Sequence, residues 1–175
     1  MVLGLDASIS STGWAIVDSD NTLVDFGKLT TKKDKNALDT NLDDDRRIYY
    51  IASEIGKLFF KHDITAVSME AQFLGKNVKT AMQLSRLRGA LMIICKVNGV
   101  DVEYPTPSEI RVNLMGKGNV TKEEVADYIR YLAYPHDSRI ESLGEFNDRQ
   151  CKAKNSDMYD AISIGLAHNK KVKKD

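Results

Sequence analysis

The sequence contains only two cysteines, and this scarcity limits what the protein can be. Cys95 and Cys151 stand far apart and form no Cys-x-x-Cys pair, which fits a reducing compartment and argues against structural zinc. The histidines, His62, His136 and His168, also lack the spacing of a metal site. No apolar run is long enough to cross a membrane, and the N-terminus lacks a basic-then-apolar signal peptide. We therefore expect a cytoplasmic protein.

Acidic residues are absent from one long segment, although 25 basic and 25 acidic residues leave the whole chain without net charge. Between Ala71 and Val100 every charged residue is basic. These residues are Lys76, Lys79, Arg86, Arg88 and Lys96. A locally basic segment can bind phosphate, and it can equally form the solvated face of a helix. The pattern alone leaves both possibilities open.

The length and composition are those of one globular domain. The chain has 175 residues, of which 42% are hydrophobic and 29% charged. This is enough for a substantial core and short for two domains. We predict a single domain over residues 1–169. A basic tail over residues 170–175 is expected to be frayed and solubilising, with at most an accessory attraction for phosphate.

The opening stretch, Val2–Val17, contains two apolar runs separated by a turn rich in serine and glycine. This pattern predicts a β-hairpin near the middle of a sheet, with Asp6 on its first strand. A charge on a buried strand is costly unless it has a partner. Asp6 can accept hydrogen bonds from backbone N–H groups of the turn, or it can ligate a metal together with carboxylates from elsewhere.

Hydrophobic periodicity predicts the other elements. We expect strands at 23–29, 64–69 and 101–104, helices at 78–97, 108–115, 121–133 and from 156 onward, and loops at 30–40 and 135–154. Asn77, Ser108 and Ser156 are expected to cap the helices that follow them. A further amphipathic helix follows Asp43, Asp44 and Asp45, with Ile48, Ile51, Ile55, Leu58 and Phe59 on one face. These three aspartates fit capping and solvation better than catalysis.

Four other acidic residues stand where predicted elements begin or end. Asp6 and Glu70 each end an apolar strand, and sites assemble at neighbouring strand ends in a mixed α/β sheet. Asp157 and Asp160 are three residues apart in the first turn of the last helix, so they lie on one face. One acid there would complement the helix dipole, but the dipole does not account for a pair.

Carboxylates that converge repel one another unless they are protonated or bridged by a cation. Oxygen ligands without histidine or cysteine favour Mg²⁺ or Mn²⁺ over zinc. Two such ions about 3.5–4 Å apart can activate a water molecule and stabilise the leaving oxygen of a phosphodiester. The four acids therefore predict a divalent-metal-dependent hydrolase with two ions in its active site.

Four stretches of the chain, in order and over nearly its whole length, resemble the RuvC family of Holliday junction resolvases. They are LGLDASISSTGWAIV, VSMEAQFLGKNVKTAMQLSRLRGA, IRVNLMGKGNVTKEEV and DMYDAISIGLAH. The resemblance implies the ribonuclease H-like α/β fold, a mixed five-stranded sheet flanked by helices. It also implies a homodimer that dimerises through helix 78–97, binds a four-way DNA junction and nicks two strands symmetrically.

The resemblance also implies roles for individual residues. The residues that match the family's metal-binding catalytic acids are Asp6, Glu70, Asp157 and Asp160. Lys122 matches a lysine near the scissile phosphate. Phe73 falls on the aromatic position that inserts at the junction centre, although it can also be a core residue. The implied DNA-binding residues are Phe73, Lys76, Asn77, Lys79, Arg86, Arg111, Lys117 and Lys122; Arg111 stands where the family often has lysine.

Two features depart from the family pattern. Asp6-Ala7-Ser8 replaces the usual Asp-Pro-Gly, and segment 134–154 is longer than in cellular bacterial members. Both features resemble the divergent resolvases of bacteriophages, which act in a bacterial host cell. We therefore expect structure-selective cutting of branched DNA with relaxed sequence specificity.

Three other functions remain to be tested against this prediction. The chain can be a ribonuclease H-like nuclease that cuts a flap or an RNA–DNA hybrid. It can be a catalytically silent protein that binds branched DNA, although the presence of all four acids weighs against this. An actin-like phosphotransferase is suggested only by the opening hairpin, and the chain is too short for two such domains.

Overall fold

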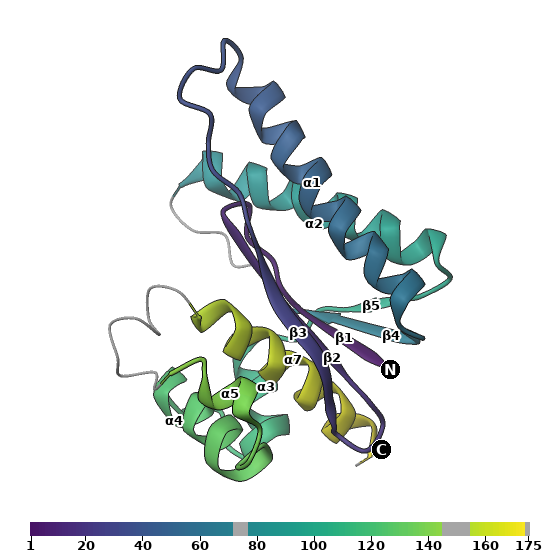
Figure 1. Cartoon of the computed structure of the whole chain (residues 1–175), viewed down its shortest axis with the longest axis vertical. Helices are drawn as coiled ribbons and strands as arrows, with labels where there is room; N and C mark the ends of the chain where they lie inside the picture. The colour runs from purple at the N-terminus through teal and green to yellow at the C-terminus, as the bar shows by residue number, and fades with distance from the viewer. Residues whose placement is uncertain (72–76, 145–154, 174–175) are drawn as a thin grey trace.

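A mixed five-stranded sheet forms the centre of the protein. The computed structural model describes residues 1–71, 77–144 and 155–173, and its strands run in the order β3-β2-β1-β4-β5 (Figure 1). β1 (Val2–Asp6), β2 (Ser11–Val17) and β3 (Leu23–Thr30) form an antiparallel meander. β4 (Ala66–Met69) pairs with β1 in parallel, and β5 (Val102–Glu103) pairs with β4 in the same direction. The predicted mixed sheet is confirmed.

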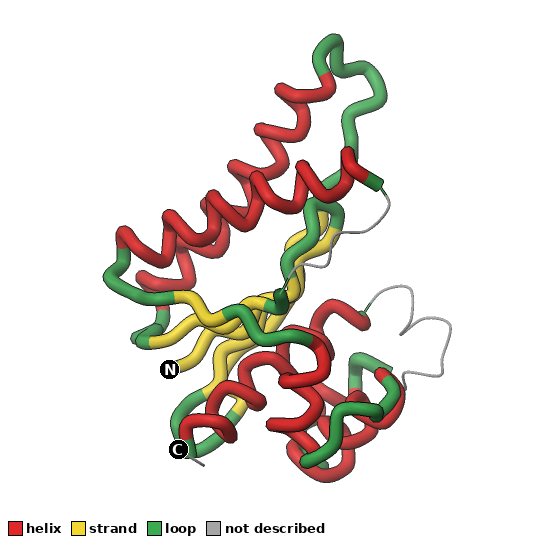
Figure 2. The backbone as a smooth tube through the Cα atoms, turned by 180° about the vertical axis from the view of Figure 1, so that it is seen from behind, coloured by secondary structure: helices red, strands yellow, loops and turns green. Residues whose placement is uncertain are grey.

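Helices cover both faces of this sheet (Figure 1, Figure 2). One face carries α1 (Thr40–Lys61) and α2 (Val78–Val97). The other carries α3 (Pro107–Met115), α4 (Lys122–Asp127), α5 (Ser138–Glu141) and α7 (Ser156–Val172). Strand side chains alternate between faces, so Leu5 and Ile16 pack towards α1 and α2, whereas Ala15 and Val17 pack towards α7. No described helix is long and apolar enough to span a membrane.

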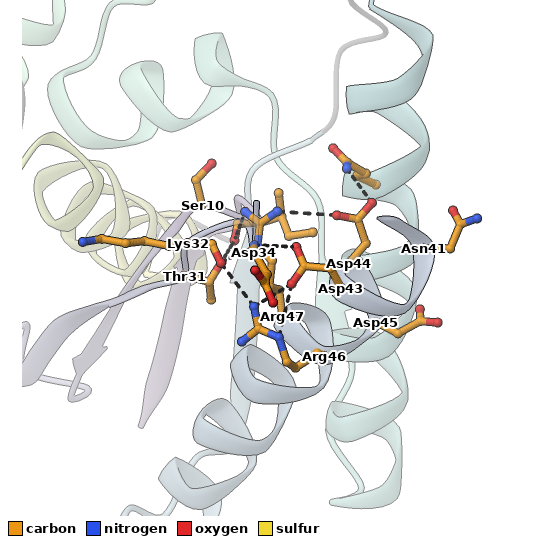
Figure 3. A network of polar contacts seen from close by, with 12 residues as sticks. Ser10, Thr31, Lys32, Asp34, Asn41, Asp43, Asp44, Asp45, Arg46 and Arg47 are labelled. Carbon is orange, nitrogen blue, oxygen red and sulfur yellow. Dashed lines mark hydrogen bonds and ion pairs between the residues drawn. The ribbon is translucent and has the colours of Figure 1, made fainter. Parts of the chain in front are cut away.

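The first turn of α1 differs from the prediction. The predicted apolar face is confirmed, because Ile48, Ile51, Ile55 and Leu58 are buried and Phe59 packs against them. Asp43 and Asp44 are also buried, so the expectation that they are solvated is wrong. Arginines three residues further on explain this burial: Arg46 pairs with Asp43 at 2.6 Å and Arg47 with Asp44 at 3.4 Å (Figure 3). Asp39, whose side chain accepts from the Asn41 N–H, caps the helix.

Helix starts are predicted correctly for α2 and imprecisely for two others. The Asn77 side chain accepts from the Thr80 N–H at 3.2 Å and caps α2 as expected. Thr106 caps α3 in place of the predicted Ser108, two residues earlier, because Pro107 suits the first helical position and Thr106 forms a capping box with Glu109. α7 begins at Ser156, so the N-cap position falls on Asn155, whose side chain makes no capping bond.

The region after α4 contains more helix than the sequence predicts. The helix expected to end near residue 133 does so, with a π-helix, η1 (Tyr128–Ala133), as its last part. The predicted loop at 135–154 includes α5, whose Ile140 is fully buried, and its residues 145–154 lie outside the described part. α7 continues to Val172, and Lys170 Nζ donates to the Leu114 carbonyl at 2.9 Å. The frayed tail expected from residue 170 is therefore helical at its start.

Glycines allow α7 to lie unusually close to the sheet. A Cβ added to Gly4 would overlap the carbonyl oxygen of Ala161, and one added to Gly13 would overlap the carbonyl oxygen of Asp157. Gly165 lies on the helix side of the same contact, within reach of Gly4 and Val17. The backbone of α7 therefore rests almost directly on β1 and β2, and this sets the height of Asp157 above the sheet.

Replacing Gly13 by Ala is expected to lower the free energy of unfolding by about 1–3 kcal/mol, because the added methyl group has to push α7 away from the sheet. Gly56→Ala in α1 is the matched control, since its Cβ would meet only the Ile94 side chain at 3.8 Å. That substitution should be neutral or stabilising by up to about 1 kcal/mol. Urea denaturation of both variants measures the difference, and equal stabilities would contradict the close-packing argument.

Candidate active site

Two carboxylates lie side by side at one edge of the sheet. Asp6 is the last residue of β1, and Glu70 directly follows β4. The two strands are parallel, with Leu5 beside Met69, and the Glu70 N–H donates to the Leu5 carbonyl at 3.4 Å. The predicted placement of both acids at neighbouring strand ends is therefore confirmed.

The first turn of α7 brings two more carboxylates to this edge. Asp157 lies directly over Gly13, the residue that pairs with Asp6 in the sheet. Its Oδ2 accepts a hydrogen bond from the Ser11 hydroxyl. Asp160, one turn further, accepts from Lys122 Nζ at 2.6 Å. Three separate parts of the chain thus supply the four acids.

The four acids share one electrostatic environment. The pKa of Asp6 is raised to about 8, chiefly by burial and then by the neighbouring charges of Asp160, Asp157 and Glu70. Burial likewise raises the pKa of Glu70, with Asp160 adding to the effect. Burial also raises the pKa of Asp160. Negative charge is therefore concentrated where a cation would be most strongly attracted.

Basic side chains from α3 and α4 offset part of this charge. Burial alone would lower the pKa of Lys122, but the carboxylates of Asp160, Asp6 and Glu70 outweigh it and raise that pKa. The charge of Arg111, on α3, partly offsets the rise that burial causes in the pKa of Glu70 and of Asp160. A small pocket joins these groups, and its lining includes Glu70, Arg111, Lys122 and Asp160.

Sequence reasoning did not assign two residues that contact the acids. Ser11 holds Asp157, and Arg88 on α2 donates to the backbone carbonyl of Glu70. The guanidinium of Arg88 also lies 4.9 Å from the centre of the Tyr104 ring. Arg88 could have been noticed as a basic residue of the acid-free segment, whereas the contact of Ser11 with residue 157 depends on the fold.

The other predicted DNA-binding residues that the structure describes do not line this pocket. Lys79 is exposed in the first turn of α2, Lys117 is exposed after α3, and Asn77 is used as a helix cap. Arg86 forms an ion pair with Asp45 and therefore has a partner within the protein. Phe73 and Lys76 lie outside the described residues.

The donor chemistry of the site fits a hard divalent cation, because all four candidate ligands are carboxylates. In the described part of the chain, no three acidic, histidine or cysteine side chains form a ready-made ligand cluster. Ser11 and Lys122 occupy oxygens of Asp157 and Asp160 in this arrangement. Both contacts are made to Oδ2, so each of these two carboxylates has a second oxygen that could ligate an ion.

Comparison with known proteins decides the family. A family model described as crossover junction endodeoxyribonuclease RuvC matches residues 2–140. The chain belongs to the RuvC family. The RuvC of Campylobacter lari is 31% identical over 99% of both chains, and that of Clostridioides difficile is 27% identical over 99% of this chain and 94% of the relative. The resemblance inferred from the four stretches is thereby confirmed.

The RuvC fold is also confirmed by structure. The Thermus thermophilus RuvC solved in complex with a Holliday junction substrate matches with a TM-score of 0.75 at 21% identity, covering 99% of this chain and 94% of that one. The ribonuclease H-like architecture expected for a RuvC protein is therefore present. The relatives named here come from cellular bacteria, and the resemblance to bacteriophage resolvases stays a prediction.

The raised pKa of Asp6 predicts that Asp6→Asn stabilises the metal-free protein at alkaline pH. The pKa of Asp6 is about 8 in the folded state, against an ordinary value of 3.8. Its contribution to stability is thus complete below the ordinary value and is lost as pH rises through about 8. Asparagine cannot ionise. As the pH rises from 3.8 to about 8, the free energy of unfolding of the variant should therefore increase relative to that of wild type. The expected increase is about 1.4 kcal/mol per pH unit, a few kcal/mol in all.

Urea denaturation in the presence of chelator, repeated across this pH range, measures the effect. Asp101→Asn is the control, because the Asp101 side chain is 86% exposed and lies away from the four acids. A stability difference between Asp6→Asn and wild type that does not change with pH would contradict the burial argument.

Proposed function

We propose that this RuvC-family chain is a Holliday junction resolvase, a structure-selective endonuclease that cuts four-way and other branched DNA by phosphodiester hydrolysis. The observation that carries the proposal is the convergence of Asp6, Glu70, Asp157 and Asp160 in one electrostatic environment at the edge of the sheet. RuvC relatives are named crossover junction endodeoxyribonucleases, and a matching RuvC structure contains a Holliday junction.

The chemistry of this family depends on divalent metal, and we assign the four acids as its ligands. Mg²⁺ is the proposed ion, with Mn²⁺ as a substitute and two ions per site, and when bound they supply positive charge at the scissile phosphate. Lys122 and Arg111 face the same pocket and are placed to neutralise phosphate oxygens. Ser11 is a positioning residue that orients Asp157.

Residues around the site are proposed to bind the branched DNA. Phe73 and Lys76 follow Glu70 along the chain, and Phe73 is assigned to stacking at the junction centre. Asn77, Lys79, Arg86 and Lys117 are assigned to the DNA backbone, with Arg86 exchanging its Asp45 partner for phosphate. Cutting is proposed to tolerate varied core sequences within a bacterial host cell.

A homodimer is proposed to bring two such sites to one junction. α2 exposes an apolar surface to solvent, made up of Val78, Met82, Met92, Ile93 and Val97. Several exposed apolar side chains on one helix are typical of a subunit interface. This supports the assignment of α2 as the dimer helix.

Loss of any one proposed ligand should abolish cleavage and spare binding. Asp6→Asn, Glu70→Gln, Asp157→Asn and Asp160→Asn should each slow junction cutting by more than about 100-fold, because even outer-shell metal partners cost about 10–100-fold. A gel assay with a labelled four-way junction, with Mg²⁺ or with chelator, measures this, and Asp101→Asn is the control. Junction affinity should stay within a few-fold.

The same assay tests the alternatives. Paired symmetric nicks on junctions of several core sequences support the resolvase, and cutting confined to one core sequence would contradict relaxed specificity. Degradation of an RNA–DNA hybrid or a flap without junction cutting would select another nuclease. Tight binding without cutting in any divalent ion would select a silent binding protein.

Disrupting the apolar surface of α2 should dissociate the dimer. Ile93, with 57% of its surface exposed in the isolated chain, would be buried by a partner. Ile93→Asp is therefore expected to shift the mass measured by light scattering from dimer to monomer. Val172→Asp is the control, since Val172 is similarly exposed on α7. A wild-type protein that is already monomeric at all concentrations would rule the interface out.

A further inference from the structure

A basic groove lies directly beside the turn that follows Asp6. Its lining comes from this turn, from the loop after β3, and from α1 and α2, and it encloses about 440 Å³. The lining residues are Ala7, Ser8, Ile9, Ser10, Lys33, Arg47, Lys79, Thr80, Gln83 and Leu84. None of these described residues is acidic, and three are basic. Lys122 and Arg111 line a separate pocket, and their helices, α3 and α4, cover the other face of the sheet (Figure 1).

The buried Arg47 holds the walls of this groove together. Only 6% of Arg47 is exposed. Its Nη2 donates to the Ile9 carbonyl at 3.2 Å and its Nε to the Thr31 hydroxyl at 2.8 Å (Figure 3). Its charge is balanced by Asp44, whose other oxygen accepts from Gln83 Nε2 at 2.6 Å. Arg47 thus links α1 and α2 to the turn that follows Asp6. Its charge is already neutralised within the protein.

The backbone around Lys33 is held by the first turn of α1. The carbonyl of Lys32 accepts from Arg46 at 3.2 Å, and the N–H of Asp34 donates to Asp43 Oδ2 at 3.2 Å. The buried Asp43 therefore does not serve as a helix cap. It holds the backbone of the loop next to Lys33 through the N–H of Asp34. The position of Lys33 at the rim of the groove is set before any ligand binds.

Lys79 stands on the other rim, in the first turn of α2. The Asn77 cap fixes this turn, and the exposed N–H groups of a helix start add to the attraction for an anion. Among the described residues, the side chains of Lys33 and Lys79 have no hydrogen-bond or ion-pair partner. Two lysines without a described partner thus line one groove, together with serine and threonine hydroxyls.

We propose that this groove binds the phosphate backbone of a DNA strand that passes over the turn following Asp6. Lys33 and Lys79 contact the phosphates, and Arg47 is a positioning residue. The chemistry is that of backbone binding, because lysines, hydroxyls and a helix start recognise phosphate oxygens and not base edges. The strand would extend from the Lys122 and Arg111 side, across the four acids, to this groove. The inference rests on the proposed action on DNA and adds a second phosphate subsite to it.

The salt dependence of junction binding tests this assignment. Each phosphate contact to duplex DNA contributes about 0.9 to the slope of log affinity against log salt concentration. Lys33→Ala and Lys79→Ala each remove one such contact from both subunits of the proposed dimer. Each substitution should therefore make this slope shallower by about 1.8 and weaken binding several-fold. Lys33→Arg should restore the wild-type slope. Fluorescence anisotropy with a labelled four-way junction in chelator measures binding without cutting.

Lys57→Ala is the matched control, since it also removes one exposed lysine charge, from a position on α1 outside the groove. Its slope should equal that of wild type. Slopes for Lys33→Ala and Lys79→Ala that match the control, in a wild-type protein that binds the junction, would overturn the subsite alone. A wild-type protein that fails to bind the junction would overturn both the subsite and the proposed function.

Discussion

The close contact between α7 and the sheet is the constraint on which the active site depends. A helix that carries ordinary side chains against a sheet stands too far away for its first-turn acids to approach the strand ends. Gly4 and Gly13 on the strands and Gly165 on the helix remove the intervening methyl groups, so backbone meets backbone. Asp157 and Asp160 thereby share the electrostatic environment of Asp6.

That approach concentrates charge, and the rest of the site compensates for it. Packing four carboxylates at a partly buried edge costs free energy, which appears as the raised pKa of Asp6. Lys122 and Arg111 reduce the cost from the α7 side, and Arg88 reaches Glu70 from α2 on the opposite face. A divalent ion would relieve the repulsion further, so a site that is strained without metal is suited to bind it.

The two faces of the sheet have different tasks. The helix α7 on one face supplies Asp157 and Asp160, whereas α1 and α2 on the other face hold the turn that follows Asp6. Arg47, buried and balanced by Asp44, fixes the carbonyl of Ile9 in that turn, and Gln83 ties α2 to the same network. Because α2 also carries the exposed apolar side chains proposed for dimerisation, one helix would connect the proposed subunit interface with the surroundings of the active site.

The sequence by itself determined the type of each main element and the identity of the four acids. Strand ends at Asp6 and Glu70, the Asn77 cap and the three-residue spacing of Asp157 and Asp160 are local features, and local patterns report them directly. Asp43 and Asp44 looked like solvated helix-cap residues. Their i,i+3 arginines are local, but the burial also depends on contacts with other segments, such as the Asp34 N–H on Asp43 and Gln83 on Asp44. Only the tertiary structure decided such long-range pairs, including Ser11 with Asp157 and Arg88 with Glu70, since close packing brings together residues that no sequence spacing relates.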